Sequence, residues 1–201
     1  MKRFNSILLI CFTAILLVLT GCPKSPAKTT TEMPSFAAEG AKLIYHVDYF
    51  GDEYDFIVDL KKIGKDIEFD WSMTSPVNSS GSVEIKEKAL KNATYLFNYF
   101  SDGDNIIMYD STTVFMSKAV YNALKKNETV TIDAGDGDEN LSFDDYEDFP
   151  VIINGEEKNL YCIYSSSDLF GWFWILDNQS FPLILKMDIG WTITLTEIVT
   201  E

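Results

Sequence analysis

The sequence predicts a mainly β domain with a minor helical part: a curved antiparallel sheet or half-barrel with one or two short helices packed on it. From about residue 41, apolar and polar side chains alternate with a period of two, which is typical of strands that bury one face. Short connections rich in Gly, Asn and Asp favour antiparallel neighbours. With 46% hydrophobic and 14% aromatic residues, the chain can form a substantial core.

Strands are expected along the whole of residues 41–201. The alternation is cleanest in Ile67–Thr74, and Pro182 favours a strand start because proline cannot donate to the interior of a sheet. Hairpins are predicted at Asp102-Gly103-Asp104 and at Asn154-Gly155. The expected strands are Leu43–Phe50, Tyr54–Leu60, Ile67–Thr74, Val83–Ile85, Tyr95–Phe100, Asn105–Tyr109, Glu128–Asp133, Val151–Ile153, Leu160–Tyr164, Gly171–Leu176, Leu183–Met187 and Trp191–Ile198.

Two stretches have helical character. Ser117–Lys126 begins with a good N-cap residue, carries an apolar stripe and ends in lysines that suit the negative end of the helix dipole. Lys86–Ala93 is expected to form one or two turns.

Two tetrapeptides are alike, Tyr49-Phe50-Gly51-Asp52 and Tyr99-Phe100-Ser101-Asp102. Each lies where a predicted strand enters a turn. We interpret the likeness as shared turn chemistry rather than as internal duplication.

The N-terminus has the pattern of a targeting segment. Lys2 and Arg3 precede an apolar run, Ile7–Leu19, which is shorter than the ~20 residues of a membrane span and suits a signal peptide. The run ends in Leu19-Thr20-Gly21-Cys22, which resembles the lipobox of bacterial lipoproteins. The expected organisation is therefore a signal peptide over 1–21, a flexible tether over 22–40 and a β-rich domain over 41–201. An ordinary secretory peptide and a membrane anchor helix are the alternatives.

The lipobox resemblance implies a covalent lipid anchor on Cys22. In that family the thiol is lipidated, the peptide is cut before the cysteine, and the new amine is acylated, commonly with palmitate. Two or more acyl chains on one residue anchor a protein stably to a membrane. Residue 23 is Pro and not Asp, which by the rule for enteric lipoproteins favours the outer over the inner membrane of the cell envelope.

The charge balance excludes one class of partner. The chain has 16 basic and 31 acidic residues, a net charge of −15. Residues 1–21 hold two basic and no acidic groups, so cleavage leaves 14 basic and 31 acidic residues, a net charge of −17. Nucleic acids are recognised through basic patches, and we expect no nucleic-acid partner.

The acidic stretch 133–148 is the sharpest local feature. Against the calcium-loop template, three ligand positions fall on Asp136, Asp138 and Asn140, and the ninth and twelfth fall on Asp144 and Glu147. The sixth position, which that loop reserves for glycine, is Leu141. The segment is a candidate Ca²⁺ site; a loop that attracts cations weakly and a plain solvated acidic loop are the alternatives. No other cofactor is expected.

No catalytic residue can be assigned from the sequence. His46 is the only histidine, which argues against histidine-based acid–base pairs and multi-histidine zinc sites. A pair of carboxylates could hydrolyse glycans, but no spacing singles one out. We therefore expect a protein that is not an enzyme.

Aromatic side chains are the candidate ligand-binding residues. Trp172 and Trp174 share one face of a predicted strand. They could form an aromatic lip to an apolar groove or a stacking platform for sugars; packing into the core is the alternative.

The segments Trp174–Asp177 and Phe181–Met187 are similar to a strand–turn–strand pattern of envelope lipoproteins with LolA/LolB-like domains. The resemblance implies a half-barrel whose concave face holds an acyl chain. Taken together, the sequence predicts a lipid-anchored, non-enzymatic envelope protein whose curved sheet binds an apolar ligand or another envelope component. The alternative is a surface structural or adhesion module with a cation-binding acidic loop.

Overall fold

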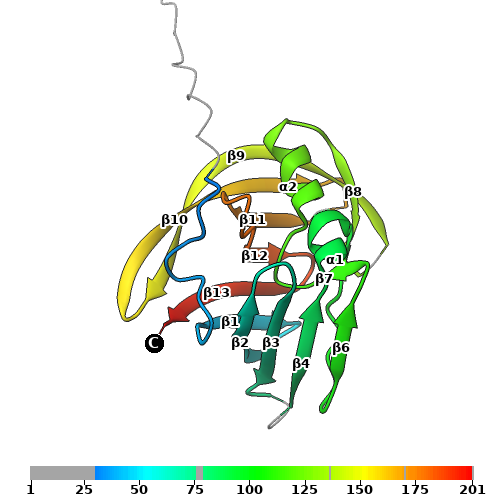
Figure 1. Ribbon diagram of the computed structural model, residues 1–201. Coiled ribbons are helices and arrows are strands. Elements are labelled where there is room, and N and C mark those ends of the chain that lie inside the picture. The colour runs from blue at the N-terminus through cyan, green and yellow to red at the C-terminus, as the bar shows by residue number, and fades with distance from the viewer. Residues whose placement is uncertain (1–29, 76–78, 136, 170, 201) are drawn as a thin grey trace, which may run out of the picture.

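The computed structural model describes residues 30–75, 79–135, 137–169 and 171–200. It confirms the predicted fold class, because the described chain is mainly β and one strongly curved sheet carries two short helices (Figure 1). Cys22 and the whole predicted signal peptide lie outside the described residues.

The elements follow the predicted order closely. They are β1 (Lys42–Tyr49), β2 (Asp52–Ile63), β3 (Ile67–Met73), β4 (Ser80–Ile85), α1 (Glu87–Asn92), β5 (Tyr95–Leu96), β6 (Asn105–Met108), β7 (Ser111–Thr112), α2 (Lys118–Lys125), β8 (Val130–Asp133), β9 (Asp138–Ile153), β10 (Glu156–Ser167), β11 (Trp172–Leu176), β12 (Ile184–Asp188) and β13 (Thr192–Val199). The strand order within the described chain is β6-β4-β3-β2-β1-β13-β12-β11-β10-β9-β8-β5-β7.

The sheet is mixed and not purely antiparallel as predicted. β4 pairs with β6 in parallel, and so do β5 with β7, β5 with β8, and β13 with β9. The last pairing closes a circuit: β13 pairs with β12 through Thr192–Thr194 and with β9 through Glu197 and Ile198. This closure explains why β9 and β10 bend so strongly over the rest of the sheet (Figure 1).

The predicted hairpin at Asp102-Gly103-Asp104 is wrong. The turn forms, but Gly103 N donates to Ser80 O and Ser82 N donates to Asp104 O, at 2.8 Å each. These bonds draw the chain onto β4, so β6 pairs with β4 instead of returning along residues 95–100. By contrast, the Asn154-Gly155 hairpin is confirmed, with φ of +52° and +79°, as a two-residue turn of type I′ requires.

The acidic stretch is not a loop. Most of it lies in β9, which pairs with β8 on one side and β10 on the other. Leu141 is fully buried, whereas Asp138, Asp144 and Glu147 are exposed. Burial of one face and two partner strands override the low strand preference of aspartate.

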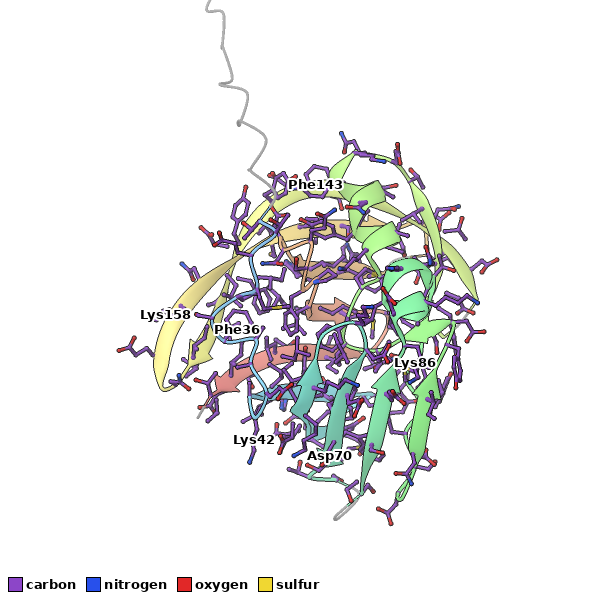
Figure 2. All side chains as sticks on the ribbon, in the orientation of Figure 1. Phe36, Lys42, Asp70, Lys86, Phe143 and Lys158 are labelled. Atoms are coloured by element: carbon purple, nitrogen blue, oxygen red, sulfur yellow. The ribbon has the colours of Figure 1, made fainter. Side chains whose placement is uncertain are left out.

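Side chains fill the space that the curved sheet and the two helices enclose (Figure 2). The buried ones form two packed clusters. The first cluster lies against β1–β4 and includes the fully buried Tyr45, Phe69 and Trp71. The second includes Tyr121 of α2 and Phe173 of β11. Ser117 caps α2 as predicted, since its side chain accepts a hydrogen bond from Val120 N.

The domain begins earlier than predicted. Residues 30–40 were expected in the flexible tether, yet Thr30 forms a bridge with Asn178. Phe36 is only 7% exposed, and its ring lies 6.4 Å from that of Phe181. The described domain therefore starts by Thr30 rather than at residue 41.

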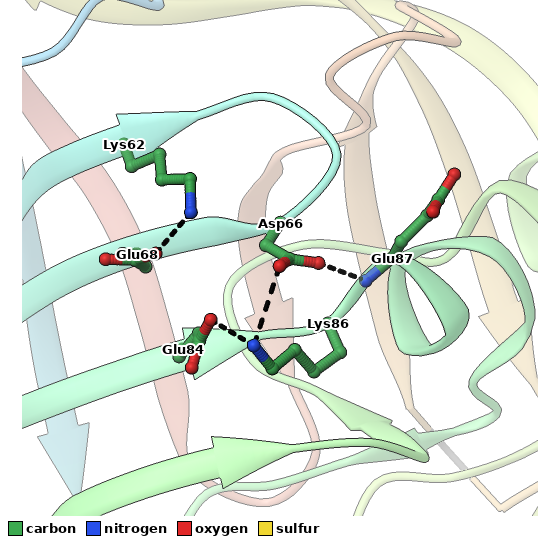
Figure 3. A network of polar contacts seen from close by, with 6 residues as sticks. All are labelled: Lys62, Asp66, Glu68, Glu84, Lys86 and Glu87. Atoms are coloured by element: carbon green, nitrogen blue, oxygen red, sulfur yellow. Dashed lines mark hydrogen bonds and ion pairs between the residues drawn. The ribbon is translucent and has the colours of Figure 1, made fainter.

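A polar network fixes the start of α1 (Figure 3). Lys86, the N-cap residue, gives no side-chain cap. Asp66, from the β2–β3 turn, accepts a hydrogen bond from Glu87 N at 2.8 Å and lies 3.5 Å from Lys86 Nζ. Lys86 also pairs with Glu84. Asp66, which is distant in sequence, thus accepts the hydrogen bond of a helix N-terminal N–H group for which the N-cap side chain provides no acceptor.

A candidate ligand-binding groove

An open groove lies at the end of the domain where β1 turns into β2 and β12 turns into β13. Its volume is about 850 Å³. Three further stretches of chain complete it: the end of β3, residues 98–101 and residues 134–135. Its lining residues are Tyr49, Phe50, Asp52, Tyr54, Met73, Ser75, Asn98, Tyr99, Phe100, Ser101, Ala134, Gly135, Ile189 and Trp191.

A small apolar recess of about 40 Å³ adjoins the groove. The two cavities share Tyr54, Met73, Asn98, Phe100 and Trp191 as lining residues, so the recess opens from the floor of the groove. Its remaining lining residues are Tyr45, Val47, Phe56, Leu96, Thr113, Val114, Ile184, Met187 and Ile193.

Apolar side chains dominate the wall of the recess, and the buried hydroxyl of Tyr45 has a hydrogen-bond partner. Tyr45 OH donates to Ile184 O at 3.0 Å, and burial raises the pKa of Tyr45 well above its usual value. At the floor of the groove, Asn98 Nδ2 donates to Ala134 O at 2.8 Å, which ties two of the lining segments together. The inner end of the site therefore favours an apolar group.

Exposed aromatic rings form the rim. The Tyr49 ring lies 4.8 Å from Phe50 and 6.0 Å from Trp191, both edge-to-face. Phe50 is 77% exposed and Tyr99 is 62% exposed. Rings that stand in solvent at the mouth of a cavity are available to a ligand.

The two similar tetrapeptides meet at this rim. Tyr49-Phe50 comes from the β1–β2 turn and Tyr99-Phe100 from the connection between β5 and β6, and both pairs line the groove. Turn chemistry accounts for the Gly51 and Ser101 positions. Turn chemistry does not explain why both Tyr-Phe pairs line the same cavity. The fold brings these two pairs together.

Backbone strain also concentrates here. Among the described residues other than glycine, positive φ occurs at Phe50 (+53°), Val114 (+44°), Asn127 (+62°) and Asn154 (+52°). Asparagine tolerates this conformation, whereas a β-branched or bulky residue does not. Phe50 lines the groove and Val114 the recess. Such outliers gather at functional sites, where the surrounding structure holds them.

The tryptophans proposed from the sequence do not line the groove or its recess. Trp174 Nε1 donates to Glu147 Oε2 at 2.7 Å. Its ring lies 4.9 Å from Tyr164, and Lys186 Nζ lies 4.8 Å from the ring centroid. Trp172 faces the same side of β11 and is half-buried. Trp191, in the turn after β12, is the tryptophan that the fold places at the cavity.

The calcium candidates are spread along an extended strand. Asp138 and Glu147 are nine positions apart in β9, or roughly 30 Å at about 3.3 Å per residue, so these two cannot ligate one ion. Asn140 Nδ2 donates to Asp168 Oδ2 at 2.8 Å, and Asp144 is exposed; Asp136 lies outside the described residues. Within the described chain, no group of three or more His, Cys, Asp or Glu is placed to hold a metal ion. Calcium binding stays a prediction.

Neither His46 nor Cys162 lies at the groove. His46 Nδ1 is 3.5 Å from Asp55 Oδ1, and both side chains are nearly half exposed. Cys162 is fully buried, and burial raises the pKa of its thiol to about 12. A thiol in this state is a poor nucleophile.

No family model, curated protein or solved structure matches the chain. Across the residues described, neither helix has the length and apolar character needed to cross a bilayer.

Proposed function

We propose that this protein is a non-enzymatic binding protein of the bacterial envelope, held to a membrane by lipid on Cys22. The groove takes up a ligand or envelope component that buries a small apolar group in the recess. The observation that carries the proposal is the groove with its apolar recess, on which the exposed aromatic rings and both bulky strained residues converge.

The size of the recess limits what it can hold. One water molecule requires about 10–15 Å³ of cavity volume. The recess has a volume of about 40 Å³, which suits a short aliphatic or aromatic group and not a whole acyl chain. The larger groove, at about 850 Å³, lies within the range of small-molecule sites, about 300–1,000 Å³. The ligand therefore has a short apolar end and a larger part that stays at the rim.

The start of the described chain and the groove lie at opposite ends of β12. Thr30 and Phe36 contact the β11–β12 connection at Asn178 and Phe181, whereas the groove includes Ile189 just beyond the other end. Thr30 follows Cys22 by eight positions, which span at most about 28 Å. The proposed anchor thus holds the domain near the membrane while the groove opens at the far end.

An uncharged fluorescent probe tests the proposal. N-phenyl-1-naphthylamine, which brightens in apolar sites, should bind the purified protein saturably. Tyr99→Ala should weaken binding about two- to tenfold, the range that one aromatic contact is worth. Tyr109→Ala is the matched control, because Tyr109 is 59% exposed and does not line the groove.

Two results would count against the proposal. One is the absence of saturable binding by the wild-type protein. The other is an equal loss of affinity in both tyrosine variants, which would place the probe elsewhere on the surface.

A further inference from the structure

We infer that the ligand of the groove is a cation, an ammonium or guanidinium group attached to a short apolar group. The inference rests on the proposed function, because it names the class of ligand that the same groove takes. It is carried by the charged side chains around the cavity and by the aromatic rim.

Within the part of the chain that the structure describes, no positively charged side chain lines the groove or the recess. The described chain contains twelve lysines and no arginine, and none of these lysines lines either cavity. Asp52 is exposed and lines the groove directly. An anionic ligand would thus meet a carboxylate and no compensating cation.

Further carboxylates flank the lining segments. Asp48 precedes Tyr49, Asp102 follows Ser101, Asp133 precedes Ala134, and Asp188 precedes Ile189. Asp48, Asp102 and Asp133 each accept a hydrogen bond from a backbone N–H group. Among the described residues, however, none of these aspartates, nor Asp52, forms an ion pair with a lysine. No lysine offsets their charge, and a surface of unopposed carboxylates attracts cations.

The rim supplies the second element of cation recognition. A cation is attracted to the face of an aromatic ring within about 6 Å of its centroid. Tyr49, Phe50 and Tyr99 are large exposed aromatics of this rim. Exposed rings beside an unpaired carboxylate match a ligand that combines positive charge with apolar surface, and they disfavour a phosphate or a fatty-acid carboxylate.

The test compares three probes that share a hexyl chain and carry a cationic, a neutral or an anionic headgroup: hexyltrimethylammonium, hexanol and hexyl sulfate. Each is titrated separately into ¹⁵N-labelled protein. The ammonium should bind at least about fivefold more tightly than the sulfate, with hexanol between them. Asp52→Asn should weaken ammonium binding about two- to fivefold, the range for one exposed charge pair, and leave hexanol binding unchanged. Asp110→Asn, an exposed residue outside the groove, should change neither.

The outcomes separate this inference from the proposed function. Equal binding of all three probes, or tighter binding of the sulfate, overturns the cationic ligand and leaves the apolar site standing. Failure of every probe to give saturable shifts at the groove overturns both. An ammonium preference that Asp52→Asn does not reduce also overturns the inference, because the charge would then lie elsewhere.

Discussion

Phe50 offers a direct test of whether strain is retained for function. The residue occupies the first central position of the β1–β2 turn with φ of +53°, and Gly51 follows with φ of +93°. The β9–β10 turn has the same backbone, with φ of +52° and +79°, but uses Asn154-Gly155. The chain thus uses the favoured Asn-Gly pair in one hairpin and a bulky residue in the other.

Replacing Phe50 by Asn should therefore not destabilise the protein. The left-handed conformation costs an ordinary residue about 1–2 kcal/mol, and asparagine much less. The ring is 77% exposed, so its removal mainly eliminates the contact with Tyr49. That contact contributes about 0.5–1.5 kcal/mol. The free energy of unfolding should change by about −0.5 to +1.5 kcal/mol, a range centred on a slight stabilisation. Phe50→Ala removes the same ring without relieving the strain, and should be about 1–2 kcal/mol less stable than Phe50→Asn.

Urea denaturation of the three proteins measures these differences. Both variants should also bind N-phenyl-1-naphthylamine more weakly than the wild type. If Phe50→Asn is as destabilised as Phe50→Ala, the strain argument is wrong. If Phe50→Asn keeps full affinity for the probe, the strain is not retained for binding.

Three further predictions concern stability and pH. Asp177→Asn should lower the free energy of unfolding, measured by urea denaturation, by about 3–5 kcal/mol. The reason is that it leaves the nearly buried Lys125, 2.9 Å away, without its carboxylate partner. Lys125→Met should lower the free energy of unfolding by less. Burial raises the pKa of Cys162 from 9.0 to about 12. Its contribution to stability should therefore be complete below pH 9.0 and should fall as pH rises toward 12. Between these pH values, the free energy of unfolding should fall less in Cys162→Ala than in the wild type. The pKa of Asp66 is held below its usual value, chiefly by the hydrogen bond from Glu87 N. Its stabilisation is present above the ordinary aspartate pKa and is lost as pH falls through the lowered one, so Asp66→Ala should lower Tm more at pH 7 than at pH 2.

Local patterns sufficed for most of the fold. Alternation located β1, β3 and β13 to within a residue or two, and Ser117 with its apolar stripe located α2. The predictions that were wrong concerned features that depend on contacts between segments distant in sequence. Residues 95–100 and 105–109 look like the arms of a hairpin, yet β4 supplies a better partner for β6. Composition likewise suggested a loop for residues 133–148, where burial of Leu141 and pairing with β10 produce a strand.

The candidate site was only partly accessible to sequence reasoning. An aromatic site was expected, but Trp172 and Trp174 were chosen because they share one face of a single predicted strand. The groove draws instead on Trp191 and on the two Tyr-Phe pairs, about fifty positions apart. Their repeated tetrapeptide was the visible signal. The two pairs become neighbours because Phe100 packs against Phe56 of β2, and β2 pairs with β1, which ends at Tyr49.

Chemical-shift mapping with hexyltrimethylammonium tests the central claim most directly. The account predicts saturable shifts in residues 49–54, 96–101, 134–135 and 189–193, with little change at Trp172 and Trp174. Saturable shifts centred on Trp172 and Trp174, or shifts scattered over the surface without saturation, would contradict it.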